Sequence, residues 1–127
     1  MSQSEPLLSP TLDPGKFKHP ARTKDGAPRA DVAFGGLRTL WFNTGTLCNV
    51  TCGNCYIESS PRNDRLSYLT RRDIRQYLDE LADSGRQAEE IGFTGGEPFM
   101  NPDIISHLRD CLVRGYRVLV LTNAMRP

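Results

Sequence analysis

The chain has 127 residues, enough for one domain with a single hydrophobic core and too few for two. Hydrophobic residues make up 38% of the chain and charged residues 24%, which is the composition of an ordinary globular protein and excludes a disordered or membrane-embedded one. The formal net charge of +1 gives no electrostatic signal for nucleic acid or anionic lipid. Partners must therefore be inferred from local motifs.

The sequence predicts a cytoplasmic protein. No apolar run approaches the roughly 20 residues that a membrane-spanning helix needs, and residues 1–14 lack the basic-then-apolar order of a signal peptide. In a reducing cytosol, clustered cysteines are more often metal ligands or redox thiols than disulfides.

Residues 1–36 are predicted to form an extended tail, separate from a domain in residues 37–127. Proline fixes φ and removes a hydrogen-bond donor, and the segment has no periodic apolar face. Its basic side chains are interrupted by Asp25 and Asp31, which favours a solvated tail over a binding arm. The prolines of the tail are Pro6, Pro10, Pro14, Pro20 and Pro28.

The first predicted strand, residues 37–43, leads directly into a cluster of cysteines. These are Cys48, Cys52 and Cys55, with the spacing C-x3-C-x2-C. Thiolates are soft ligands, and a loop this short can place several sulfurs around one inorganic centre. The centre would lie at the carboxyl end of a strand, where α/β sheets place their chemistry.

A first helix is predicted to begin at Thr70 and to end at Gly85. Thr70 is a good N-cap, and Asp73 stands three residues later, as in a capping box. Apolar residues recur at helical spacing and predict one buried face. This face comprises Ile74, Tyr77, Leu78, Leu81 and Ala82.

A second strand, residues 90–94, runs into the motif Gly95-Gly96-Glu97-Pro98. Two adjacent glycines are common in turns, so the pair alone is weak evidence for a ligand site. The motif gains its value from following a strand and preceding a capped helix.

A second helix is predicted to start at Asn101 as its cap, with Pro102 in its first position, and to end at Gly115. We expect His107 to lie near solvent or near the cap, and Cys111 to be a buried small apolar residue. The predicted inward face is Ile104, Ile105, Leu108, Cys111 and Leu112.

The third predicted strand, residues 116–121, is nearly continuously apolar, as expected for a strand covered by helices on both sides. Thr122 and Asn123 follow at its end. The order β-α-β-α-β with right-handed crossovers predicts an α/β fold with a parallel sheet. Because no helix follows this strand before Pro127, we expect the chain to be the N-terminal portion of a larger barrel.

Other chemistries are open for the cysteines. A fourth ligand would complete a zinc site, although structural zinc usually uses two C-x2-C pairs and only one is present. Cys52 and Cys55 could form a thioredoxin-type dithiol, but that motif normally opens a long helix, and Pro61 comes too soon. A non-catalytic iron–sulfur module is a further alternative. The candidate fourth zinc ligands are His19, His107 and Cys111.

The C-x3-C-x2-C cluster after the first strand and Gly95-Gly96-Glu97-Pro98 after the second resemble the radical S-adenosylmethionine (radical SAM) enzymes. The resemblance covers residues 37–127 and implies the N-terminal half of a partial TIM-type (β/α)6 barrel. It also implies that the three cysteines bind three irons of a [4Fe–4S] cluster. The fourth iron would take the amino and carboxylate groups of S-adenosylmethionine, with the Gly-Gly-Glu motif at the amino end.

The resemblance further implies a reaction type. The reduced cluster would cleave S-adenosylmethionine to methionine and a 5′-deoxyadenosyl radical, which abstracts hydrogen from a substrate. An external one-electron donor of the flavodoxin or ferredoxin type would supply the electron. Thr122 and Asn123 face the same mouth and are further candidate cofactor contacts. The substrate is not indicated, because members of this family act on many compounds.

Overall fold

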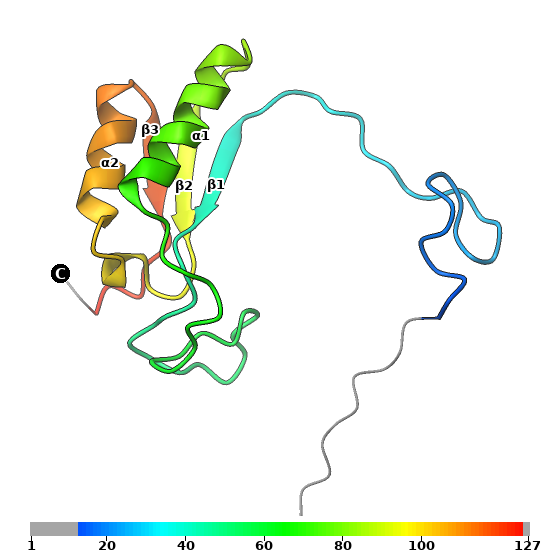
Figure 1. The fold of residues 1–127 in the computed structure, drawn as a ribbon, viewed down its shortest axis with the longest axis horizontal. Helices are drawn as coiled ribbons and strands as arrows, with labels where there is room; N and C mark the ends of the chain where they lie inside the picture. Colours follow the sequence, from blue (N-terminus) through cyan, green and yellow to red (C-terminus); the bar gives the residue numbers. More distant parts are fainter. Residues whose placement is uncertain (1–12, 126–127) are drawn as a thin grey trace, which may run out of the picture. The chain divides into compact units, whose positions relative to one another are not determined.

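Three parallel strands alternate with two helices in the computed structural model, which describes residues 13–125 (Figure 1). The strands form one sheet in the order β1-β2-β3. This arrangement confirms the predicted α/β fold. The elements are β1 (Thr39–Asn43), α1 (Arg71–Asp83), β2 (Glu90–Thr94), the 3₁₀ helix η1 (Pro98–Met100), α2 (Ile104–Val113) and β3 (Arg117–Val120).

The chain divides into two compact units, Met1–Phe34 and Gly35–Pro127. In the described part of the first unit, the Asp13 carboxylate accepts a hydrogen bond from Lys24 Nζ at 2.8 Å. The Arg29 guanidinium lies 5.4 Å from the centre of the Phe17 ring. The described part of the predicted extended tail, residues 13–36, therefore contains local turns, and residues 1–12 lie outside the described residues.

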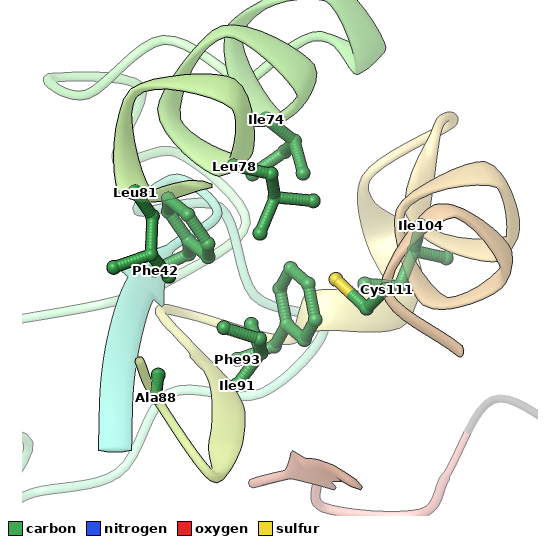
Figure 2. Close-up of a cluster of buried hydrophobic side chains, with 9 residues drawn as sticks. All are labelled: Phe42, Ile74, Leu78, Leu81, Ala88, Ile91, Phe93, Ile104 and Cys111. Atoms are coloured by element: carbon green, nitrogen blue, oxygen red, sulfur yellow. The ribbon is translucent and has the colours of Figure 1, made fainter. Parts of the chain in front are cut away.

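The core lies between one face of the sheet and both helices (Figure 2). Phe42 of β1 pairs in register with Phe93 of β2, and their ring centres are 5.8 Å apart. Both rings point toward the helices, so the sheet and the helices share one apolar layer. The buried core residues are Phe42, Ile74, Leu78, Leu81, Ala88, Ile91, Phe93, Ile104 and Cys111.

Helix α1 begins as predicted. The Thr70 side chain and the Asp73 carboxylate form both halves of a capping box. Gly85, with φ of +68°, follows the end of the helix in the left-handed region. The predicted buried face is too wide, because Tyr77 and Ala82 are exposed. Tyr77 instead lies at the rim of the core, against Phe42.

Helix α2 begins later than predicted. Residues 98–100 form η1, and Asn101 Oδ1 accepts a hydrogen bond from the Asp103 amide at 2.8 Å, so Pro102 lies in a turn that precedes the helix. The Asn101 amide group donates to the carbonyls of Thr44 and Leu69. Asn101 thus joins three segments, a larger role than that of a simple cap.

The buried face of α2 also differs from the prediction. Ile105 and Leu112 are exposed, whereas His107 and Asp110 are buried. The expectation that His107 lies near solvent is wrong: its side chain is fully buried, and Nε2 lies 3.0 Å from the Leu69 carbonyl oxygen. The helix turns these polar residues inward because the segment before α1 and the first turns of α1 provide their partners.

β3 is not covered on both sides in the described structure. Its burial alternates along the strand, because α1 and α2 both pack on the same face of the sheet (Figure 1). On the other face, the Trp41 ring lies directly over Gly92, where any β-carbon would overlap it. Trp41 itself is 44% exposed. Within residues 13–125, no helix is long and apolar enough to span a membrane.

Candidate functional site

The carboxyl ends of the three strands lead to three segments that lie against one another (Figure 1). They are the cysteine loop (residues 44–60), the glycine loop (residues 95–97) and the segment 122–125. The Gly96 amide donates to the Gly45 carbonyl at 2.8 Å, and the Glu97 amide donates to the Leu47 carbonyl at 3.0 Å. Parallel strands bring their carboxyl ends to one edge, so the fold itself assembles this site.

The glycines of the glycine loop are required by the cysteine loop. Gly95 has φ of +142°, and a β-carbon there would overlap the Gly45 carbonyl and the Thr44 hydroxyl. A β-carbon at Gly96 would overlap the Leu47 carbonyl. The close approach that two glycines allow is thus made to a neighbouring backbone, and their contact with a cofactor stays a prediction.

Glu97 is a buried carboxylate, only 2% exposed, that joins the glycine loop to the end of β3. Its Oε1 accepts hydrogen bonds from the Phe99 amide at 3.0 Å and the Thr122 hydroxyl at 2.7 Å. Its Oε2 accepts one from the Asn123 amide at 2.8 Å. A carboxylate offers about four lone-pair positions, so these donors leave Glu97 little capacity for a further one.

Asn123 connects the same junction to the first cysteine. Its Nδ2 donates to Asn49 Oδ1 at 2.8 Å and lies within hydrogen-bonding range of Cys48 Sγ, at 3.8 Å. The structure therefore brings together Cys48, Glu97 and Asn123 from the ends of all three strands. The motifs predict that these three residues share one mouth, whereas Asn49 carries no sequence signal other than its position beside Cys48.

The three cysteines have different surroundings. All are free thiols: Cys48 is buried, Cys52 is exposed and Cys55 is intermediate. The Ser59 amide donates to Cys55 Sγ at 3.3 Å, and hydrogen bonds from the Ser59 and Ile57 amides lower the pKa of the Cys55 thiol. Because the thiolate is the metal-binding form, these amides favour Cys55 as a ligand.

The donor set of the cysteine loop, three thiols within eight residues, is of the kind that binds iron–sulfur clusters. Among residues 13–125, no group of three His, Cys, Asp or Glu side chains is arranged to hold one metal ion. A [4Fe–4S] cluster has no such requirement, because each thiolate binds a different iron. Donors already lie near the Cys48 and Cys55 sulfurs, and the Cys52 side chain is accessible.

The other chemistries considered for the cysteines find less support. Cys111 and His107 are buried in the core with α2, and the pKa of the Cys111 thiol is raised by burial to about 11. Residues 56–70 form turns and irregular structure, so Cys52 and Cys55 do not open the long helix of a thioredoxin-type dithiol.

The family model described as "Radical SAM superfamily" matches residues 42–127. The chain belongs to the radical SAM superfamily. The match begins within β1 and includes the cysteine loop, the glycine loop and the end of β3. Family membership was thus predictable from the two motifs and their order along the chain.

Two relatives and one solved structure are similar to this radical SAM chain. It is 32% identical over 123 residues to 7-carboxy-7-deazaguanine synthase of Methanopyrus kandleri. This match covers 80% of this chain and 43% of that protein. It is 37% identical over 76 residues to the antilisterial bacteriocin subtilosin biosynthesis protein AlbA of Bacillus subtilis, which covers 60% of this chain and 16% of that protein. The chain therefore spans less than half the length of either relative.

The solved structure is that of Streptococcus suis SuiB bound to S-adenosylmethionine. The likeness has a TM-score of 0.60 at 23% identity and covers 72% of this chain and 20% of that one. At this identity the likeness concerns the fold alone. It supports the arrangement of parallel strands alternating with helices.

Proposed function

We propose that this chain binds a [4Fe–4S] cluster through Cys48, Cys52 and Cys55 and presents it, with S-adenosylmethionine, for radical generation. The observation that carries the proposal is the joining of the cysteine loop, the glycine loop and the end of β3 at one edge of the sheet. Three thiolates leave one iron of such a cluster without a protein ligand, as a catalytic centre requires.

The chain's own residues would hold the two groups in place. The loops cannot move apart freely, because backbone hydrogen bonds join Gly96 to Gly45 and Glu97 to Leu47. The glycine loop would face the amino end of S-adenosylmethionine, with Thr122 and Asn123 beside it. Since chain donors already use most of the lone pairs of Glu97, its main contribution is to fix the loop that meets the cofactor.

Held by Cys48, Cys52 and Cys55, a reduced cluster would supply the one electron needed to cleave S-adenosylmethionine to methionine and a 5′-deoxyadenosyl radical. An external one-electron donor of the flavodoxin or ferredoxin type would reduce the cluster. By their names, the two relatives belong to different processes, deazaguanine synthesis and bacteriocin biosynthesis. The proposal therefore covers how the radical is made and assigns no substrate.

Anaerobic reconstitution of the chain with iron and sulfide tests this proposal. We expect about four irons per chain and, after reduction with dithionite, a [4Fe–4S] EPR signal that shifts when S-adenosylmethionine is added. An EPR signal that does not respond would indicate a non-catalytic iron–sulfur module. Stoichiometric zinc without iron would contradict the proposal altogether.

A further inference from the structure

We propose that Asn123 is a positioning residue for the cluster, which orients the Cys48 ligand and raises the reduction potential of the cluster through an N–H···S hydrogen bond. This inference rests on the proposed function, because it requires that Cys48 bind iron. It goes beyond that function because it assigns a tuning role to a side chain that contributes no cluster ligand. Three structural observations and one electrostatic argument support it.

The orientation of the Asn123 amide is determined at both ends. The Met125 backbone amide donates to Asn123 Oδ1 at 3.0 Å. Because a backbone N–H can only donate, the oxygen must face Met125, and the amide nitrogen must face Asn49 and Cys48. The Asn49 oxygen accepts from that nitrogen at 2.8 Å, which fixes it beside the Cys48 sulfur, at 3.8 Å.

The backbone of Asn123 is also anchored. The buried Glu97 carboxylate accepts hydrogen bonds from the Asn123 amide and the Thr122 hydroxyl, and Thr122 Oγ1 in turn accepts one from the Ala124 amide at 3.0 Å. Ala124 has φ of +56°, an uncommon conformation for a residue with a side chain. The turn at 122–125 is thus held in one conformation that aims the Asn123 side chain at the cysteine loop.

The three cysteines receive hydrogen bonds in different ways. Cys55 takes its donor from the backbone of its own loop, at Ser59. Cys52 is exposed to solvent. Cys48 is only 6% exposed, and the amide that approaches it comes from Asn123, 75 residues later in the chain. Only the Cys48 sulfur is therefore linked by a hydrogen bond to the end of β3 among the described residues.

An amide donor at a buried sulfur favours the reduced cluster. Reduction adds one negative charge, part of which resides on the sulfurs, and an N–H dipole pointed at a sulfur stabilises that charge. Burial of Cys48 strengthens the effect on the sulfur side of the contact, while Asn123 itself is an exposed residue. Loss of the donor should thus make the cluster harder to reduce, while the iron ligands themselves remain in place.

The test is a redox titration of the reconstituted chain, followed by EPR without S-adenosylmethionine. Asn123→Asp keeps the oxygen that Met125 needs but replaces the amide donor with a negative charge. Asn123→Leu removes the donor without adding charge, and Asn123→Gln retains an amide. Gln87→Glu is a matched control, because it adds the same charge in the connection before β2, at the opposite end of the sheet from the cysteine loop (Figure 1).

We expect Asn123→Leu and Asn123→Asp to lower the reduction potential, with the larger change in Asn123→Asp, and Asn123→Gln and Gln87→Glu to remain near wild type. A tenfold change in the ratio of reduced to oxidised cluster at a fixed potential corresponds to about 59 mV for a one-electron couple. Potentials equal to wild type in both the Leu and the Asp variants would overturn the proposal.

The amount of iron that each variant retains is a second test of the proposal. If the Leu and Asp variants lose iron while Asn123→Gln retains it, the donor is needed to hold the Cys48 ligand, which supports the proposal. If Asn123→Gln also loses iron while Gln87→Glu binds it, Asn123 acts through packing and the proposal fails. A wild-type cluster that does not respond to S-adenosylmethionine would contradict the proposed function alone, since these comparisons use the cluster without that cofactor.

Discussion

The Gly96 amide donates a hydrogen bond to the Gly45 carbonyl at 2.8 Å, and this contact joins the glycine loop to the cysteine loop. A β-carbon at Gly96 would overlap the backbone of Leu47 and Thr46. We expect Gly96→Ala to push the loops apart, to lower stability by about 1 to 3 kcal/mol through overpacking, and to reduce the iron bound after reconstitution.

The matched control for this variant lies inside the cysteine loop. Gly53, between Cys52 and Cys55, has open space where its β-carbon would lie, and its φ is not positive. Gly53→Ala should therefore bind iron as wild type does. Equal iron binding by the Gly96 and Gly53 variants would show that close contact between the two loops is not needed for the site.

Single replacement of Cys48, Cys52 or Cys55 by Ala should abolish cluster binding, because each thiolate is expected to hold a separate iron. Cys111→Ala is the control: Cys111 is fully buried in the core, so its loss should lower stability without removing iron. Iron and sulfide analysis with the visible absorption spectrum would measure this. Loss of iron from the Cys111 variant would instead indicate a site with four cysteines.

The Asp110 carboxylate joins α2 to the start of α1, where it accepts hydrogen bonds from Arg71 and Arg75 at 2.8 Å each. Asp110→Asn removes the charge that these guanidinium groups share, and we expect the melting temperature to fall by several degrees. Asp79→Asn removes an exposed partner of Arg114 and should change it much less. Equal melting temperatures for the two variants would contradict the prediction that the Asp110 contacts stabilise the fold more than the Asp79 contact does.

The same carboxylate should give the stability an acid-dependent part. Hydrogen bonds from Arg71 and Arg75 lower the pKa of Asp110 well below its ordinary value of 3.8. The stabilisation is then present above about pH 4 and is lost as the pH falls further, because the unfolded chain takes up the proton first. Denaturant titrations at pH 5 and pH 3 would measure this. Between these two pH values, the free energy of unfolding should decrease less in Asp110→Asn than in wild type.

Local patterns predicted the elements of this fold well. The capping box at Thr70 and Asp73 depends on residues three apart, and Gly85, which follows the end of α1, is a similarly local signal. The inward face of α2 could not be predicted this way. Periodicity assigns apolar residues to the core, whereas the partner that turns Asp110 inward, Arg71, lies 39 residues away.

In the candidate site, too, the residues of short motifs could be predicted, whereas the contacts between distant residues could not. Cys48 and Glu97 were identifiable from short motifs, because family members share the spacing and order of those motifs. The bond between Asn49 and Asn123 joins residues 74 positions apart, and neither carries a pattern that would pair them in a single sequence. Only the parallel arrangement of the strands brings them together.

His107 should make stability depend on pH near neutrality. Its Nε2 bonds to the Leu69 carbonyl, which requires Nε2 to carry the proton, and none of the described residues offers a hydrogen-bond partner to the buried Nδ1. Burial lowers the pKa of His107 below its ordinary value of 6.5, although hydrogen bonding to Leu69 and the nearby Asp103 and Asp110 oppose the shift. The folded chain therefore resists protonation at a pH where the unfolded chain accepts it.

Linkage determines the sign of this effect. Above about pH 7 the imidazole is neutral in both the folded and the unfolded chain, so the full stability is present. As the pH falls through 6.5, the unfolded chain binds the proton first, and the free energy of unfolding decreases. His107→Gln, which keeps a donor for Leu69, should remove this decrease between pH 7 and pH 5. His19→Gln, at the other histidine of the chain, should leave it unchanged. A decrease that persists in the His107 variant would show that another group is responsible.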